Sequence, residues 1–308
     1  MRSTVAEISI DNLKHNLSML RKKSGNAEVM GIIKADAYGH GLVQIASFLR
    51  KENVKILGVA FADEAVALRK SGDNGEIFVT IPGTEYDTEL YCAYNIQSSV
   101  EDINIVRKLS DEAHSRNMKV KTHLFINTGM NRDGIDPKNA LEFMEQCKSL
   151  DGIDMIGILT HFASSELEDK SFALNQLKIF NETVTLLNEN GYHFKYIHTA
   201  NSGAIANLLE SKFNLVRAGI SLYGYMDYEY LANKLNLKPI LTLKSKVINI
   251  NKIDKGDNVG YSLNFIAEKQ SKIAVVPLGY GDGYHRTLSN KAECLINGKR
   301  YGLVGTIC

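Results

Sequence analysis

The chain has 308 residues, of which 44% are hydrophobic and 23% are charged, and its formal net charge at pH 7 is +1. This length suits one large domain or two domains of ordinary size. The balanced charge excludes a strong electrostatic preference for nucleic acid or an anionic membrane. No apolar run approaches the ~20 residues that a membrane span requires, and the N-terminus lacks the apolar segment of a signal peptide. We therefore expect a cytoplasmic protein.

The four cysteines are far apart in the sequence, at Cys92, Cys147, Cys294 and Cys308. Their spacing matches no metal-ligand pattern, so we predict no metal site. We expect reduced and mostly buried thiols, as in proteins of a reducing compartment.

Residues 1–230 alternate between short apolar runs and longer amphipathic segments. Leu13, Leu17 and Leu20 recur at helical spacing behind Asp11, a possible N-cap, and predict the first helix. Eight apolar runs rich in Val and Ile are typical of parallel strands that are buried on both faces. These predicted strands are 29–33, 56–61, 77–81, 95–98, 120–126, 155–160, 196–199 and 215–217.

Eight strand–helix repeats favour a (β/α)8 barrel, the TIM-barrel fold, over residues 1–235. A doubly wound open sheet fits the same alternation and stays open as an alternative. The pattern changes after Leu241, where apolar and polar residues alternate as in half-buried strands. We therefore predict a second, all-β domain over residues 236–308.

The last residues of this second domain predict a hairpin and a strand that is not followed by further sequence. Asn297-Gly298 lies between two apolar runs and predicts a tight hairpin. Residues 303–308 have the pattern of the middle of a strand, and about 70 residues are few for an independent β domain. We therefore expect that the chain lacks a C-terminal part.

In a barrel, function resides in the loops at the carboxyl ends of the strands. Lys34 ends the first predicted strand, where partial burial would lower the pKa of its amine and suit covalent chemistry. A lysine that only reaches the rim is the alternative. Residues after the seventh and eighth strands could bind phosphate, although Asn201-Ser202 is also a plain helix cap. The candidate site residues at or after the strand ends are Lys34, Arg132, His161, Ser202, Arg217, Gly219 and Ile220.

The segment Gly31–Gly41, with Lys34-Ala35-Asp36-Ala37-Tyr38 at its centre, resembles the attachment motif for pyridoxal 5′-phosphate (PLP) in the alanine racemase family, fold type III. Further motifs follow in the family's order and extend the resemblance over the whole chain. They are Asn127–Arg132, Thr160–Ala163, Ala200–Ser202, Arg217–Gly224, Gly260–Ser262 and Gly279–Tyr284.

The resemblance implies a PLP-dependent racemase that interconverts L- and D-alanine for peptidoglycan, in a homodimer with shared active sites. Lys34 would attach the cofactor and act as one base, and Tyr261 of the partner chain would be the other. Arg132 would assist at the substrate carboxylate. The remaining cofactor contacts would come from Tyr38, His161, Ser202, Arg217, Gly219 and Ile220.

Departures from the family pattern leave alternatives open. Phe125 occupies a position where many members carry a carbamylated lysine, so Arg132 must be oriented differently, and Asn127 could supply an amide hydrogen bond. A serine or broad-specificity racemase, also as the catalytic portion of a larger protein, is therefore an alternative to an alanine racemase. A decarboxylase of the same fold, a non-catalytic PLP carrier, and a PLP-binding chain inactive through truncation are further ones.

Overall fold

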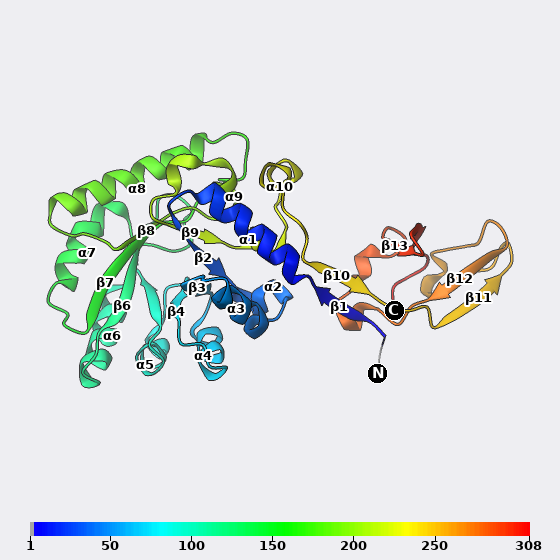
Figure 1. Cartoon of the computed structure of the whole chain (residues 1–308), viewed down its shortest axis with the longest axis horizontal. Coiled ribbons are helices and arrows are strands. Elements are labelled where there is room, and N and C mark those ends of the chain that lie inside the picture. The colour runs from blue at the N-terminus through cyan, green and yellow to red at the C-terminus, as the bar shows by residue number, and fades with distance from the viewer. Residues whose placement is uncertain (1–2) are drawn as a thin grey trace. The chain divides into compact units, whose positions relative to one another are not determined.

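The computed structural model describes residues 3–308, which form two compact units (Figure 1). Ser9–Ile240 form the barrel unit, and residues 3–8 together with Leu241–Cys308 form the β unit. The N-terminal strand therefore belongs to the same unit as the C-terminal segment.

The barrel unit contains one sheet of eight parallel strands in the order β8-β7-β6-β5-β4-β3-β2-β9. Its open edges meet where Arg217 N donates to Ala200 O at 2.9 Å, so the sheet closes into a barrel. The eight predicted strands and the barrel are thereby confirmed, and the open sheet is excluded. The strands are β2 (Glu28–Ile32), β3 (Ile56–Val59), β4 (Glu76–Val79), β5 (Gln97–Val100), β6 (Val120–Phe125), β7 (Ile153–Leu159), β8 (Tyr196–His198) and β9 (Leu215–Ala218).

Helices follow the strands, and Figure 1 shows α5 to α8 on the outer side of the sheet. Their apolar residues face the strands, as expected for amphipathic helices of a barrel. The helices are α1 (Ile10–Ser24), α2 (Lys34–Gly39), α3 (Leu42–Lys51), α4 (Ala62–Lys70), α5 (Thr88–Ala93), α6 (Ile103–Ser115), α7 (Ala140–Cys147), α8 (Ser171–Glu189), α9 (Ser202–Asn207) and α10 (Glu229–Leu235).

The first helix begins earlier than predicted. Ser9, not Asp11, is the N-cap of α1, and its hydroxyl accepts a hydrogen bond from Asn12 N at 3.2 Å. Asp11 lies in the first turn, where its negative charge is favourable near the helix N-terminus. Leu13, Leu17 and Leu20 are buried as predicted.

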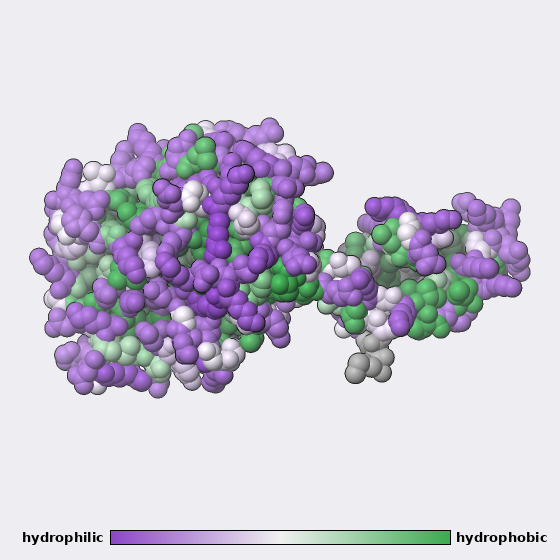
Figure 2. All heavy atoms as spheres, viewed as in Figure 1, coloured by the Kyte–Doolittle hydropathy of each residue, from purple (hydrophilic) through white to green (hydrophobic). Residues whose placement is uncertain are grey.

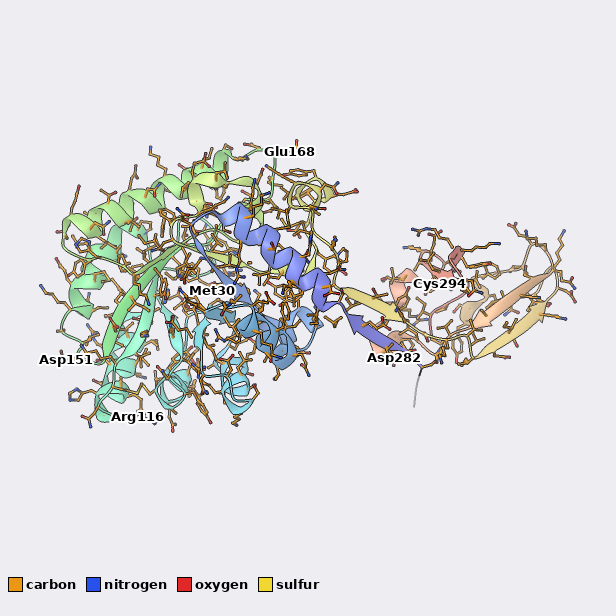
Figure 3. All side chains as sticks on the ribbon, viewed as in Figure 1. Met30, Arg116, Asp151, Glu168, Asp282 and Cys294 are labelled. Atoms are coloured by element: carbon orange, nitrogen blue, oxygen red, sulfur yellow. The ribbon has the colours of Figure 1, made fainter. Side chains whose placement is uncertain are left out.

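The interior of the barrel contains large apolar side chains from most of its strands. Met30 of β2 is fully buried and lies among the strands in Figure 3. Its cluster includes Phe78, Phe125 and Leu159. This cluster occupies part of the barrel interior, which also contains buried polar side chains such as His123 and His198.

The β unit consists of three antiparallel pairs. β1 (Val5–Ile8) pairs with β10 (Leu241–Lys244), β11 (Asn249–Ile253) with β12 (Ser271–Val275), and β13 (Glu293–Ile296) with β14 (Lys299–Gly302). Asn297 and Gly298 both have positive φ, at 50° and 78°, which confirms the predicted hairpin.

The predicted strand over residues 303–308 is wrong, because β14 ends at Gly302. Side chains take the backbone donors that a neighbouring strand would need. Gly305 N donates to Asn290 Oδ1 at 2.7 Å, and Ile307 N donates to Ser289 Oγ at 3.0 Å. Within 241–308 only Ala267, Gly279 and Gly305 are buried, and apolar residues are visible on this unit's surface in Figure 2.

Two sequence predictions concern the whole chain. All four cysteines are free, but only Cys92 and Cys147 are buried, so the prediction of mostly buried thiols holds for two of them. In residues 3–308 no helix is both long enough and apolar enough to cross a membrane.

Candidate active site

A cavity of about 330 Å³ in the barrel unit is bordered by residues that follow the carboxyl ends of the strands. It lies at the end of a barrel where enzymes of this architecture have their active sites. Eight of the predicted site residues line it: Lys34, Tyr38, Arg132, His161, Ser202, Arg217, Gly219 and Ile220.

Lys34 follows β2 and is partly withdrawn from water. Burial lowers the pKa of its amine below 10.5, and the positive charge of Arg132 lowers it further, whereas Glu64 has the opposite effect. A lowered pKa increases the fraction of neutral amine at physiological pH. The Lys34 amine is therefore suited to act as a nucleophile or a base.

The segment after Lys34 has an uncommon backbone. Residues 35–38 of α2 all have φ between 52° and 54°, which makes this turn a left-handed helix. L-residues in this conformation cost about 1–2 kcal/mol each, so other contacts must hold the turn. Glu64 Oε1 accepts from Ala35 N at 2.5 Å, and His40 Nδ1 donates to the carbonyls of Ala37 and Tyr38 at 3.0 and 2.9 Å.

The left-handed turn places Tyr38 against the loop after β9. An added Cβ at Gly219 would lie 2.8 Å from Tyr38 Oη, so the absence of a side chain there leaves space beside the hydroxyl. Burial raises the pKa of Tyr38 to about 12, which keeps the hydroxyl protonated. Ser202 Oγ, 8% exposed, accepts from Gly219 N and Ser221 N at 3.1 and 3.3 Å.

Asn201 and Ser202 were predicted either to cap a helix or to bind phosphate, and the structure shows the cap. The Asn201 side chain caps α9 by accepting from Ala204 N at 3.0 Å. The Ser202 hydroxyl instead faces Ser221 Oγ, at 2.9 Å, and lines the cavity. The cap and the polar end of the cavity are thus built from adjacent residues.

Arg217 of β9 is buried, and carbonyl oxygens and imidazoles hold its guanidinium. Nη1 donates to His198 O and His198 Nδ1 at 2.7 and 3.0 Å, and Nη2 donates to Thr160 O and His161 Nδ1 at 2.7 and 3.2 Å. Burial lowers the pKa of Arg217 to about 9, so it remains protonated at neutral pH. In the part of the chain that the structure describes, no hydrogen bond starts from its Nε, which leaves this donor for a ligand.

Arg132 follows β6, and its side chain is 55% exposed. Asp133 is its ion-pair partner, with 2.8 Å between Nε and Oδ2. The predicted amide hydrogen bond from Asn127 to Arg132 is not observed. Asn127 instead organises the loop, because its Oδ1 accepts from Gly129 N and Asn131 N at 3.0 and 3.1 Å. Phe125 is buried and lines the cavity.

Comparisons with known proteins decide the family. The family model "Alanine racemase, N-terminal domain" matches residues 8–227, and "Alanine racemase, C-terminal domain" matches residues 240–308. This chain belongs to the alanine racemase family. The prediction of a missing C-terminal part is not borne out, because the C-terminal domain model matches the segment after the barrel unit.

Individual relatives support this assignment. Alanine racemase 1 of Clostridium acetobutylicum is 38% identical over 312 residues, covering 100% of this chain and 80% of that protein. The solved alanine racemase of Clostridium difficile 630 has a TM-score of 0.95 and 34% identity, covering 99% of this chain and 81% of that one. A histidine racemase from Leuconostoc mesenteroides subsp. sake has a TM-score of 0.89 at 25% identity, covering 100% of this chain and 82% of that one.

The ninth predicted site residue of this alanine racemase family member lies in the β unit. Tyr261 begins a short 3-10 helix, Tyr261–Leu263, and its side chain is 70% exposed. Its hydroxyl is thus accessible to solvent, and the backbone carbonyl of Tyr261 accepts from Thr306 Oγ1 at 3.1 Å.

Sequence reasoning missed several groups at this site. Glu166 and Asp227 line the cavity, although neither belongs to a recognised motif. Glu64 holds the left-handed turn from α4, one strand–helix repeat further along the chain. His198 lies within a predicted strand, and its contacts with Arg217 and His123 became visible only in the structure.

Proposed function

We propose that this chain is an alanine racemase that uses PLP to interconvert L- and D-alanine. One observation carries the proposal: the partly buried amine of Lys34 and the buried guanidinium of Arg217 line one cavity. The first group suits covalent attachment of an aldehyde, and the second can only donate hydrogen bonds. The product D-alanine would supply peptidoglycan, and the free cysteines suit a cytoplasmic location.

The residues of the cavity fit the parts of PLP. Ser202 Oγ, Tyr38 Oη and the space beside Gly219 suit a phosphate group, and Ile220 lines the same end. The Nε of Arg217 has no hydrogen bond within residues 3–308 and suits a ring nitrogen that accepts. These residues would hold the cofactor, whose conjugated ring supplies the electron sink that makes a Cα proton removable.

The two faces of the substrate require two bases. The Lys34 amine would remove or return the Cα proton on one face, and the hydroxyl of Tyr261 from the partner chain would do so on the other. Arg217 remains protonated and only donates, so an acceptor placed against it stays unprotonated. Arg132 would bind the substrate carboxylate, with Asp133 fixing its guanidinium.

His161 connects these groups. Burial and then the charge of Arg217 lower the pKa of His161 well below its usual value, so the imidazole is neutral. Its Nδ1 accepts from Arg217 Nη2 at 3.2 Å, which leaves the proton on Nε2. His161 would therefore present one fixed N–H donor to the ring of the cofactor or to the phenolic oxygen of Tyr261.

A homodimer is part of the proposal, because the β unit has too little core to stand alone. Ala267 is the one hydrophobic residue of its described part that is buried, whereas Ile248, Ile250 and Leu295 are about 60% exposed. A two-fold dimer would cover such a surface and would bring Tyr261 to the site of a second copy.

The test is racemisation of L-alanine by the PLP-loaded protein, measured as D-alanine formed. The Lys34→Ala variant should lose both this activity and the long-wavelength absorbance of lysine-bound PLP. A matched control is Lys55→Ala, because Lys55 also lies in the barrel unit but pairs with Glu28 on the surface. Undiminished absorbance in Lys34→Ala would refute the assignment of Lys34.

A second candidate is a racemase with another or a broader substrate range, including serine. Phe125 gives the cavity an apolar wall, and a histidine racemase shares the fold over the whole chain. Turnover of L-alanine, L-serine and L-histidine should be compared under one condition. A preference for either of the latter two would favour this candidate.

A further inference from the structure

Five polar side chains form a continuous hydrogen-bonded chain through the interior of the barrel. It starts at Arg217, beside the cavity, and ends at Glu76, the first residue of β4 at the opposite end of the barrel. Its links are Arg217 Nη1–His198 Nδ1 (3.0 Å), His198 Nε2–His123 Nδ1 (2.8 Å), His123 Nε2–Gln97 Oε1 (3.1 Å) and Gln97 Nε2–Glu76 Oε2 (2.9 Å).

The middle of this chain is shielded from water. His123 and His198 are 0% exposed, and Gln97 and Arg217 are 4% exposed. A buried polar group without a partner is strongly destabilising, so each link constrains the next one. Burial, followed by the charge of Arg217, lowers the pKa of His123 to about 3 and that of His198 well below its usual value. Both imidazoles are therefore neutral and carry one proton each.

The barrel is shaped around His123. A Cβ at Gly157 of the neighbouring strand would lie 2.2 Å from His123 Nδ1, so only glycine leaves room for the imidazole. The rings of Phe78 and Tyr196 pack against it, with centroids 4.4 and 5.8 Å away. The ring of His123 is thus fixed by packing as well as by hydrogen bonds.

The two ends of this hydrogen-bonded chain independently determine the direction in which its links donate. Arginine only donates, so His198 Nδ1 must accept, and the proton of His198 must be on Nε2. A carboxylate only accepts, so the amide N–H of Gln97 points to Glu76, and its carbonyl accepts from His123 Nε2–H. Both proton assignments agree with a hydrogen bond in which His198 Nε2–H donates to His123 Nδ1. Every link therefore donates in one direction, from Arg217 toward Glu76.

We propose that Glu76, Gln97 and His123 are positioning residues that keep His198 as an acceptor toward Arg217 and thereby fix the guanidinium with Nε free for a ligand. The alternative tautomer of His198 would point an N–H at the N–H donors of Arg217 and would displace the guanidinium. Tyr196 Oη donates to the same oxygen of Glu76 at 3.3 Å, which anchors the far end. The inference rests on the proposed function only where it takes the free donor to face the PLP ring nitrogen.

The first test needs no cofactor. In the ligand-free protein labelled with 15N-histidine, NMR should show both buried histidines neutral, with protons on Nε2 only. Their resonances are assigned by their loss in His123→Phe and His198→Phe. A proton on Nδ1 of His198, or an imidazolium at either position, would overturn the proposal. This result does not depend on whether the protein is a racemase.

The second test measures PLP affinity and the absorbance maximum of bound PLP. Glu76→Leu removes the terminal acceptor, so we expect about tenfold weaker binding and a shifted maximum. Glu76→Gln keeps a carbonyl that can accept from Gln97, so it should stay close to the unmodified protein. Glu28→Leu is the matched control, because Glu28 is the first residue of β2 and pairs with Lys55 on the surface.

Two outcomes of the second test would contradict the proposal. In the first, Glu76→Leu binds PLP as tightly as Glu28→Leu does. In the second, Glu76→Gln loses as much PLP affinity as Glu76→Leu, which would mean that the charge of Glu76 matters and not its role as a hydrogen-bond acceptor. If the unmodified protein bound no PLP, the proposed function would fail, and the tautomers of His123 and His198 would still decide the inference.

Discussion

At the scale of single residues, Gly219 controls the space beside the Tyr38 hydroxyl. An added Cβ would lie 2.8 Å from Tyr38 Oη and 3.6 Å from Ser202 Oγ. Gly219→Ala should therefore weaken PLP binding about ten- to hundredfold, since overpacking costs about 1–3 kcal/mol. Equilibrium titration with PLP measures the effect.

Two variants control this prediction. Gly302→Ala adds the same methyl group where no described residue beyond its chain neighbours has an atom within 4 Å of it, so it should leave affinity unchanged. In a Tyr38→Phe background the clashing hydroxyl is gone, so the additional loss caused by Gly219→Ala should be smaller. An equal loss in both backgrounds would show that Tyr38 is not the group displaced.

The positive charge of Arg132 lowers the pKa of the Lys34 amine. Burial is the larger cause of the lowered Lys34 pKa, and Arg132 is the next. An aldehyde reacts with the neutral form of an amine, so under the proposed function Arg132→Gln should shift the midpoint of the pH profile of PLP attachment upward. The midpoint should remain below 10.5, because burial persists. Rates of PLP attachment measured across pH test this shift.

The matched variant is Arg107→Gln, because the guanidinium of Arg107 donates to Asn104 of α6 and to Gln146 of α7 on the surface. It should leave the midpoint where it is. A downward shift in Arg132→Gln would mean that Arg132 does not repel the protonated Lys34, and the assignment of the charge effect would be wrong.

The sequence identified site residues that belong to contiguous motifs, such as Lys34 and Tyr38. It did not find Glu76 or His123, because strand periodicity does not tell which buried polar residues meet across a barrel. Asn127 was expected to supply an amide hydrogen bond, and its side-chain oxygen accepts from backbone N–H groups of its own loop. An amide next to a turn bonds the nearest backbone N–H groups before it reaches a more distant side chain.

At the scale of elements, the left-handed turn of α2 stores backbone strain next to Lys34. Ala35 has φ 52° and is exposed, so its side chain makes no contribution from burial. Ala35→Gly should stabilise the ligand-free protein by about 0.5–1 kcal/mol, because glycine adopts this conformation without steric strain. The free energy of unfolding in urea measures the change.

The same substitution in a right-handed helix should have the opposite sign. Ala67 is exposed within α4, and Ala67→Gly should destabilise the protein by about 1 kcal/mol. Ala35→Val should also destabilise it, since a β-branched side chain suits this backbone poorly. If Ala35→Gly were as destabilising as Ala67→Gly, the left-handed turn would be wrong.

Elements with strong periodicity were predictable, and those governed by tertiary contacts were not. The eight apolar runs matched β2 to β9 because parallel strands buried on both faces need such runs. The left-handed turn carries no periodic signal, since it depends on Glu64 and His40. The segment after Gly302 is apolar like a strand, yet side chains of Ser289 and Asn290 occupy its donors.

At the scale of the whole molecule, the two units differ in how they are stabilised. The barrel unit encloses a packed interior, whereas the β unit has one buried hydrophobic residue, Ala267, in its described part. Small domains without a core need an additional stabilising partner. The exposed side chain of Tyr261 lies on this second unit, so dimerisation and catalysis are linked in the proposed function.

This link predicts complementation between two inactive variants. Lys34→Ala and Tyr261→Phe should each be inactive alone. In a hybrid dimer with two-fold symmetry, one site lacks both groups and the other has an intact Lys34 and an intact Tyr261. Free exchange makes half of the dimers hybrids, so the mixture should regain about a quarter of the unmodified activity.

The control mixture pairs Tyr261→Phe with the double variant Lys34→Ala/Tyr261→Phe, in which no intact Tyr261 exists and no activity should return. Native mass spectrometry establishes whether hybrids form. Hybrids without recovered activity would exclude Tyr261 as a base supplied by the partner. Recovery would require that Lys34 and Tyr261 of different chains act on one substrate, because neither variant alone contains both groups.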